Sequence, residues 1–342
     1  MSALQSIRIV GGGLAGLSLG IALRKAGVQT EIFEAGAYPR HRVCGEFITG
    51  LNNETIDQLG IGSALTEAGS HRLVTWFVRE RVIGQQTLPA PALALSRYAL
   101  DSRLAALFVA EGGRLSAQTR FKPMPDDPGL VLACGRRTSS SSPWLGLKLH
   151  VRNLTFTGEL EFHVGDDAYV GLSSVEDGWI NVCGLFRKRP GLQFERDEAL
   201  PAYLRASGLR ALSERLAAAE IRPGSRSAVA GFVFDRHVTA EGGVWLGDAC
   251  ATIPPFTGNG MAMAFTGAAL AIDPLVAWSR DELSWSETAS CIHAALRHEF
   301  RVRLSSAAFL HPFLLNRPLQ FCVGGALRAG LLPITTMYRL LH

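Results

Sequence analysis

Three glycines near the start of the chain have the spacing of a phosphate-binding turn. Gly11, Gly13 and Gly16 in "VGGGLAGLSLG" follow the pattern G-x-G-x-x-G. In this pattern the first glycine permits a tight turn and the second lets backbone amides approach a pyrophosphate. The third lets the following helix pack closely against the strand. The turn therefore predicts a dinucleotide site.

The segments around this turn have the order that such a site needs. The apolar spacing predicts a strand over residues 7–10, a helix over 14–26 and a second strand over 30–33. The start of that helix offers free N–H groups and partial positive charge to phosphates. Glu34 ends the second strand, where a carboxylate can accept hydrogen bonds from ribose hydroxyls. An acid there disfavours a 2′-phosphate, so NADP is a poor candidate for this site.

A second glycine-rich stretch lies more than two hundred residues downstream, in "WLGDACATIPPFTGNGMAMAF". A short strand ends at a Gly-Asp pair, and a Pro/Gly loop then leads into a helix of small residues. A nicotinamide-dependent dehydrogenase does not need a second glycine-rich loop, far along the chain, to bind its cofactor. The Gly-Asp pair is Gly247-Asp248, and the loop and the start of the helix contain Pro255, Gly258, Asn259, Gly260 and Met261.

Together the two stretches resemble the group A flavin monooxygenases and the geranylgeranyl-reductase-like flavoproteins, and the resemblance covers most of the chain. It implies bound FAD, with the first turn on the adenylate half and the second on the isoalloxazine ring. Asp248 would bind the ribityl or pyrophosphate end. Gly258 and Gly260 would let the backbone lie against the ring edge. The helix that starts near Asn259 would point its positive end at the ring, where negative charge gathers on reduction.

Two further stretches match the same family. "SRYALDSRL" resembles its R-x-x-L-D-x-x-L helix, which makes Arg97 a contact to FAD phosphate or ribityl oxygens; a solvated arginine is the alternative. "YPRHRVCGEFITG" resembles the loop that reaches the ring, so Arg42 is expected on phosphate. Cys44 and Gly45, together with Pro255, are expected beside the isoalloxazine ring as residues of the catalytic site. Cys44 as a small buried apolar residue remains open.

One departure from the family concerns the electron donor. Hydroxylases of this superfamily carry an Asp-Gly pair where this chain has Cys134-Gly135, in "LVLACGRRT". The missing acid puts direct reduction by NAD(P)H in doubt. Because the sequence has no second G-x-G-x-x-G, the donor is either NAD(P)H that visits transiently or a separate reductase.

The middle of the chain alternates apolar and polar residues. Segments 145–152 and 159–164 have the period of two that predicts an antiparallel sheet with one face covered. His150 and His163 fall on the polar face, where we expect solvated side chains, and His237 is a third candidate acid–base residue. Residues 71–91 are expected to add a strand. Helices are predicted over 193–220 and 262–308.

The predicted fold is α/β, a Rossmann-like FAD-binding domain with an inserted antiparallel β-sheet substrate domain and a helical C-terminus. The resemblance implies a para-hydroxybenzoate-hydroxylase-like layout. We expect the FAD-binding domain over 1–70, 92–142 and 236–285, the sheet domain over 71–91 and 143–235, and the C-terminal helical region over 286–342.

Several functions follow from this resemblance. The favoured one is a monooxygenase that hydroxylates an aromatic or polyketide-type molecule through a C4a-hydroperoxyflavin. The alternative is a C=C reductase for an isoprenoid or polyene, which the Cys44-Gly45 loop and the apolar C-terminus favour. A halogenase is less favoured because "GWINVC" replaces the expected Trp-x-Trp-x-Ile-Pro signature. A flavin-binding protein without turnover remains open.

Composition limits the partners. The chain has 342 residues and a net charge of +4, without a basic run dense enough to follow a nucleic-acid backbone. Six scattered cysteines, with no metal-ligand spacing, favour reduced thiols in the cytoplasm. Residues 309–342 are apolar but interrupted by Arg317, Pro318, Arg328 and Pro333, so a spanning helix is not expected. Peripheral membrane contact through this segment is the minority interpretation.

Overall fold

A computed structural model of the chain describes residues 4–122, 127–234, 243–328 and 334–341. Its first sheet is parallel, with the strand order β14-β7-β1-β2-β6. The strands are short; β7 is fully buried, β1 and β2 alternate buried and half-buried residues, and the edge strand β6 is the most exposed. Their bounds are β1 Ile7–Val10, β2 Thr30–Phe33, β6 Arg114–Ser116, β7 Leu130–Leu132 and β14 Val244–Trp245.

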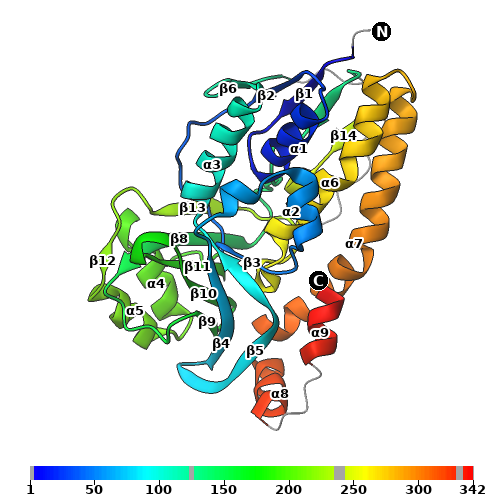
Figure 1. Ribbon diagram of the computed structural model, residues 1–342. Helices are drawn as coiled ribbons and strands as arrows, with labels where there is room; N and C mark the ends of the chain where they lie inside the picture. Colours follow the sequence, from blue (N-terminus) through cyan, green and yellow to red (C-terminus); the bar gives the residue numbers. More distant parts are fainter. Residues whose placement is uncertain (1–3, 123–126, 235–242, 329–333, 342) are drawn as a thin grey trace.

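Four long helices pack around this sheet (Figure 1). They are α1 Leu14–Lys25, α3 Arg97–Ala110, α6 Gly260–Ser279 and α7 Trp285–Leu315. Helix α6 touches both α1 and α7, and its apolar residues belong to the main core. By length and hydropathy α6 alone among the described helices passes as a candidate membrane span, but 56% of that window is buried inside the protein. A buried core helix explains its composition.

The second sheet is larger, with the order β12-β8-β11-β10-β9-β4-β5-β3, and β13 pairs with β8. Its neighbours are antiparallel except for β4 and β9, which run parallel. The bounds are β3 Phe47–Ile48, β4 Gly69–Val78, β5 Arg81–Ala94, β8 Trp144–Arg152, β9 Leu160–Gly165, β10 Ala168–Ser174, β11 Ile180–Arg187, β12 Glu220–Ile221 and β13 Ser227–Ala230.

Residues 71–91 form two strands of this sheet and not one. β4 and β5 are joined by a tight turn in which Arg79 and Glu80 both have positive φ, 47° and 68°. Hairpin turns of this kind favour glycine or asparagine. Because neither residue is present, the sequence carried no turn signal.

The prediction of one covered face is wrong, because both faces of the central strands are buried. Helices α4 (Ala199–Ala206) and α5 (Arg210–Ala217) cover one face. On β8, the polar residues Lys148 and His150 are also buried. His150 and His163 are therefore not solvated; each lies beside a carboxylate, Glu46 and Glu161 respectively. His237 lies outside the described residues.

The C-terminal helices complete the fold, and the predicted α/β architecture with a helical C-terminus is confirmed. Helix α7 starts at a capping box formed by Ser284 and Glu287 and reaches from the first sheet to the second. The division into three domains stays a prediction. The remaining elements are α2 Asn53–Leu59, α8 Arg317–Arg328, α9 Ile334–Leu341 and the 3-10 turns η1 Gly62–Leu65, η2 Glu176–Gly178, η3 Arg196–Glu198, η4 Gly247–Ala249 and η5 Pro255–Thr257.

The core position of α6 gives a stability prediction. Phe265 on this helix is fully buried, so Phe265→Ala should lower the free energy of unfolding by about 3–5 kcal/mol. Phe309→Ala, at a side chain that is 69% exposed, should change it by less than about 0.5 kcal/mol. Urea unfolding followed by circular dichroism measures both. Equal losses in the two variants would contradict the burial of α6.

Candidate flavin site

One cavity of about 880 Å³ collects most of the predicted site residues. It lies where the first glycine turn, the loop over 40–47, the segment over 133–138 and the second glycine loop meet. This is the carboxyl end of the parallel strands, where open α/β sheets bind ligands. The predicted residues that line it are Gly11, Gly13, Glu34, Arg42, Cys44, Gly45, Arg97, Gly247, Asp248, Pro255, Gly258, Gly260 and Met261.

The three glycines of the first turn have different surroundings. A Cβ on Gly11 would lie 2.2 Å from the Ala133 carbonyl oxygen, and one on Gly16 would lie 2.0 Å from the Gly11 carbonyl oxygen. Both positions therefore require glycine for close backbone packing, and Gly16 does not line the cavity. A Cβ on Gly13 would meet only Arg97, at 3.9 Å, so the space over this residue is free to receive a ligand.

The Glu34 carboxylate accepts hydrogen bonds from the surrounding protein. One carboxylate oxygen accepts hydrogen bonds from the Gly36 amide at 2.8 Å and from Arg40 at 2.6 Å. The other accepts from the Gly12 amide at 2.9 Å. The carboxylate thus fixes the glycine turn directly, while its predicted contact to ribose stays a prediction.

Two arginines share one buried aspartate beside the turn. Asp101, fully buried, receives two hydrogen bonds from Arg97, at 2.6 and 2.8 Å, and one from Arg42 at 2.9 Å. Burial lowers the pKa of Arg97, but the Asp101 carboxylate outweighs it and the net shift is upward. Sequence reasoning missed Asp101, although its place four residues after Arg97 on a helix was the available signal.

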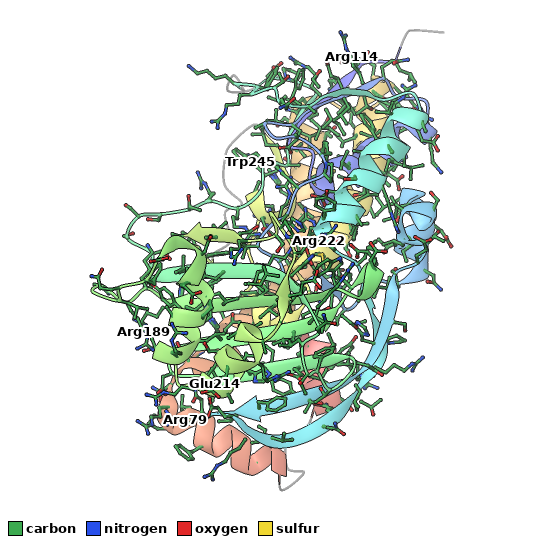
Figure 2. All side chains as sticks on the ribbon, turned by 90° about the vertical axis from the view of Figure 1, so that its left-hand side faces the viewer. Arg79, Arg114, Arg189, Glu214, Arg222 and Trp245 are labelled. Atoms are coloured by element: carbon green, nitrogen blue, oxygen red, sulfur yellow. The ribbon has the colours of Figure 1, made fainter. Side chains whose placement is uncertain are left out.

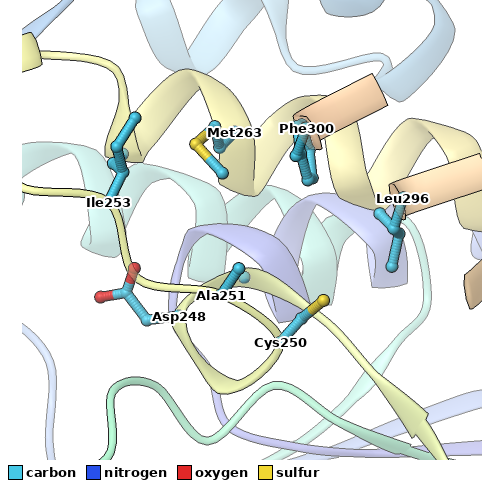
Figure 3. Close-up of a pocket in the computed structure, with 9 residues that line it drawn as sticks. Asp248, Cys250, Ala251, Ile253, Met263, Leu296 and Phe300 are labelled. Carbon is cyan, nitrogen blue, oxygen red and sulfur yellow. The ribbon is translucent and has the colours of Figure 1, made fainter. Parts of the chain in front are cut away.

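The second glycine loop brings Asp248 to an arginine from the opposite wall. Arg136 Nε lies 3.5 Å from Asp248 Oδ2, and Arg136 Nη2 donates to the Val43 carbonyl at 3.2 Å. Figure 3 shows Asp248 on its loop, with the apolar side chains of Ile253 and Met263 nearby. Arg136 is visible in the sequence, but nothing there indicates this pairing.

The residues after Asp248 divide between the cavity and the core. Gly258 has a φ of +67°, and a Cβ there would lie 2.2 Å from the Phe47 ring, so only glycine fits. Asn259 does not line the cavity. Its side-chain amide donates to the Leu341 carbonyl at 2.7 Å, which ties the start of α6 to the last turn of α9.

The Cys44-Gly45 pair lies on the cavity wall and is held from behind. The buried amide of Asn181 donates to both carbonyls, at 3.0 Å to Cys44 and 2.8 Å to Gly45. Burial raises the pKa of the Cys44 thiol, so this thiol is protonated at neutral pH. It is therefore a poor nucleophile in this structure.

A buried charged cluster lies directly behind this pair. Glu46 accepts hydrogen bonds from Lys148 at 2.8 Å, from His150 Nε2 at 2.6 Å and from the Arg97 amide at 2.9 Å. Burial alone would raise the pKa of Glu46, but Lys148 and His150 lower it to about 2. The alternating pattern had indicated a solvated face here. The cluster forms because Glu46 of the 38–50 loop contacts this face of β8, and the sequence gives no sign of that contact.

Aromatic rings cover the far side of the second loop. The ring of His311, from α7, lies among those of Trp144, Tyr169, Phe234 and Phe256, at centroid distances of 5.3–6.0 Å. Its Nε2 lies 3.4 Å from the Tyr169 hydroxyl. Burial lowers the pKa of His311 to about 4, so its ring is neutral at pH 7.

The cavity fits an anionic dinucleotide. Arginine is the commonest charged residue in its lining: five arginines face two carboxylates. Arg42 Nη2 is buried and lies 3.6 Å from Glu34 Oε2, but it makes no hydrogen bond within the described residues, so it can donate to a phosphate or ribityl oxygen. Gly13 leaves room for a pyrophosphate at the start of α1. Within the described residues, no group of His, Cys, Asp or Glu is arranged to hold a metal ion.

These features define a dinucleotide-binding α/β protein with a two-loop cofactor site. Residues 4–133 match the family model of the FAD binding domain. Residues 4–133 thus carry an FAD-binding domain, and FAD is the cofactor that the two-loop site is built to hold.

Comparison with curated protein sequences gave no match. Comparison with solved structures supports the fold. The flavin-dependent brominase Bmp2 is 18% identical, with a TM-score of 0.78 over 98% of this chain and 92% of that one. PqsL from Pseudomonas aeruginosa, a probable FAD-dependent monooxygenase, is 14% identical, with a TM-score of 0.71 over 92% and 97%. CtdE, solved with FAD and substrate, is 15% identical, with a TM-score of 0.72 over 92% and 90%.

The neutral state of His311 gives a pH prediction. In the unfolded chain a histidine takes up its proton near pH 6.5, whereas folded His311 does so near pH 4. The unfolded state therefore binds the proton first, and stability falls as pH drops from 6.5 to 4, by up to about 3 kcal/mol from this residue. His311→Phe should flatten that part of the profile.

Urea unfolding at pH 7 and at pH 4.5 measures the effect. His298→Phe, at an exposed position on the same helix, is the matched control and should keep the wild-type slope. An unchanged slope in the His311 variant would show that this ring is not buried in its neutral form.

Proposed function

We propose that the protein is an FAD-dependent monooxygenase that hydroxylates an aromatic or polyketide-type small molecule. The observation that carries this proposal is the position of the cavity, between two flavin-type glycine loops and the buried face of the second sheet. Structures of similar fold point the same way: PqsL has been solved in complex with 2-aminobenzoylacetate, and CtdE with FAD and a substrate.

The predicted site residues receive roles in this proposal. Bound FAD would supply the two-electron chemistry with dioxygen. Gly11 and Gly13 would hold its pyrophosphate at the start of α1, where Gly16 lets the helix pack against the strand, and Arg42 and Arg97 would be the positive partners. The ring would lie along the second loop. The residues assigned to that end are Cys44, Gly45, Gly247, Asp248, Pro255, Gly258, Gly260 and Met261. Asn259 would act indirectly, by holding the start of α6.

The apolar wall supports an aromatic substrate. Phe232 and Phe234 line the cavity, and Phe234 packs against the neutral ring of His311. Aromatic walls bind planar molecules by offset or edge-to-face contact and exclude water from the reacting atoms. Electrons would come from NAD(P)H that visits transiently or from a separate reductase, and the cavity holds Cys134 where hydroxylases carry an acid.

The cofactor assignment is tested at Gly13. Gly13→Val should fold with unchanged stability, because its Cβ meets no atom closer than 3.9 Å, yet the branched side chain would fill the place of the pyrophosphate. We expect at least a 100-fold loss of FAD affinity, measured by quenching of flavin fluorescence. Gly84→Val, whose Cβ would also lie in open space, is the control and should bind FAD normally.

The reaction is tested with the reduced holoprotein. Oxygen consumption coupled to product, with 2-aminobenzoylacetate and simple phenols as probes, supports hydroxylation. Anaerobic reoxidation of the reduced cofactor by a polyene would instead establish the C=C reductase. A Gly13→Val variant that binds FAD like wild type would overturn the cofactor assignment.

We also propose a cytoplasmic enzyme that touches the membrane through its C-terminal helices. Five described cysteines, 44, 134, 183, 250 and 291, carry free thiols, as a reducing compartment favours. Phe309 on α7, Phe321 on α8 and Leu340 on α9 are exposed, and Arg339 lies next to Leu340. Exposed aromatic residues and nearby arginines suit an anionic bilayer surface.

Co-sedimentation with phosphatidylglycerol-containing vesicles tests this contact. The Phe309→Ser/Phe321→Ser variant should lose at least tenfold in vesicle affinity, whereas Val82→Ser, an exposed apolar position on β5, should not. Equal binding by all three proteins, or none by wild type, would exclude the contact.

A further inference from the structure

The buried charged cluster reaches the cavity through one side chain. His41 is half-buried and lines the cavity. Its Nδ1 lies 3.3 Å from Lys148 Nζ, and Lys148 in turn donates to Glu46 at 2.8 Å. The His41 ring also meets the His150 ring edge-on, at a centroid distance of 4.9 Å. The proposed reaction gives this cluster no role so far.

Fold stability does not explain the cluster. The side chains of Glu46, Lys148 and His150 are all 0% exposed. Removing such charges from water costs several kcal/mol per ion, and apolar residues of similar size are often at least as stabilising. Glu46 also has a positive φ of 57°, which is strained for a non-glycine residue. Buried, strained and charged groups at a cavity wall indicate function.

The contact with Lys148 decides the tautomer of His41. A lysine ammonium has only donors, so Lys148 must donate and His41 Nδ1 must accept. In neutral His41 the proton is therefore on Nε2. Because Glu46 holds Lys148 in place, this tautomer is fixed.

The surroundings also keep His41 neutral. Burial is the first cause, and the positive charge of Lys148 is the second; together with His150 and Arg222 they outweigh Glu46 and bring the pKa of His41 to about 4. The Tyr98 ring stacks on the His41 ring at a centroid distance of 4.6 Å. The guanidinium carbon of Arg222 lies 4.8 Å from the centroid of the Tyr98 ring. Figure 2 shows Arg222 where the second sheet meets the helical part of the molecule. A neutral imidazole with Nε2–H is therefore the form present at pH 7.

We propose that His41 is the proton donor of the cavity, and that Lys148 and Glu46 are the positioning residues that fix its tautomer and restore its proton. The proposal rests on the monooxygenase function. His41 Nε2 gives its proton to an alkoxide- or phenolate-type oxygen formed in the cavity, while Nδ1 takes a proton from Lys148 Nζ. Only N–H and O–H bonds change. When the product leaves, Nδ1 returns its proton to Lys148 Nζ and Nε2 takes a proton from water in the cavity, which restores the starting tautomer.

The inference also narrows the substrate class. The net result of the two transfers is that the Lys148 ammonium loses a proton and the cavity oxygen gains one. The accepting oxygen must therefore be strongly basic. The substrate is thus one whose reaction leaves a negative oxygen near the Cys44-Gly45 wall, as hydroxylation of a phenol or an enol does.

The tautomer is measured first, by two-bond ¹H–¹⁵N correlation in the apoprotein with ¹⁵N-histidine, the His41 signal being assigned from its loss in His41→Ala. We expect His41 to be neutral from pH 6 to 8, with the proton on Nε2. Glu46→Gln/Lys148→Met removes both buried charges together, which avoids an unpaired one, and should give a mixture of tautomers. A proton on Nδ1 in the wild type would overturn the proposal.

Turnover is measured second, with a phenol that supports coupled oxygen consumption. His41→Ala should keep its FAD affinity within threefold but slow product formation by about 100-fold or more, and added imidazole should restore part of the rate. The triple variant that also carries the Glu46→Gln/Lys148→Met pair should be no slower than His41→Ala alone, because the groups act as a unit. His298→Ala, exposed on α7, is the control.

The outcomes separate the two proposals. If wild type binds no FAD or consumes no oxygen with any probe, the monooxygenase function fails, and the tautomer experiment alone decides the role of the cluster. If wild type turns over and His41→Ala matches its rate, or if the losses simply add, the proton-donor role fails and the function stands.

Discussion

Three buried carboxylates hold the cationic side chains in the cavity wall and directly behind it. Asp101 orients Arg97 and Arg42, Glu34 holds Arg40 and the glycine turn, and Glu46 holds Lys148. Each is nearly or fully buried, so its charge is weakly screened and its hydrogen bonds are strong. An array of arginines without these anchors would repel itself. The carboxylates make the positive wall compatible with a folded protein.

The topology explains why distant segments meet at this wall. In the parallel sheet, β1 lies between β2 and β7, and β14 follows on the far side of β7. The loops after these strands therefore open at the same edge. The 38–50 loop adds its own strand, β3, to the second sheet by pairing with β5. One short segment thus contacts the cofactor cavity on one side and the second sheet on the other.

The sequence predicted those parts of the fold and site that depend on local chemistry. Gly11, Gly13 and Gly16 and the alternation along β8 can be recognised from residue type and spacing alone. Period-two alternation cannot tell a polar face turned to water from one turned to another part of the protein, so His150 and His163 were expected to be solvated. The β4–β5 turn and the positive φ of Glu46 left no signal either, since tertiary contacts stabilise backbone conformations that these residue types disfavour.

The hydrogen bond from Asn259 to the Leu341 carbonyl means that helix α9 stabilises the start of α6. The residue that opens α6, next to the proposed ring site, is braced by the final helical turn, although 82 positions separate the two in sequence. Displacing the last helix, by a fused affinity tag or by an adsorbing surface, would break this hydrogen bond and free the start of α6. We expect the absorbance of bound flavin to change when the C-terminal helix is displaced in this way.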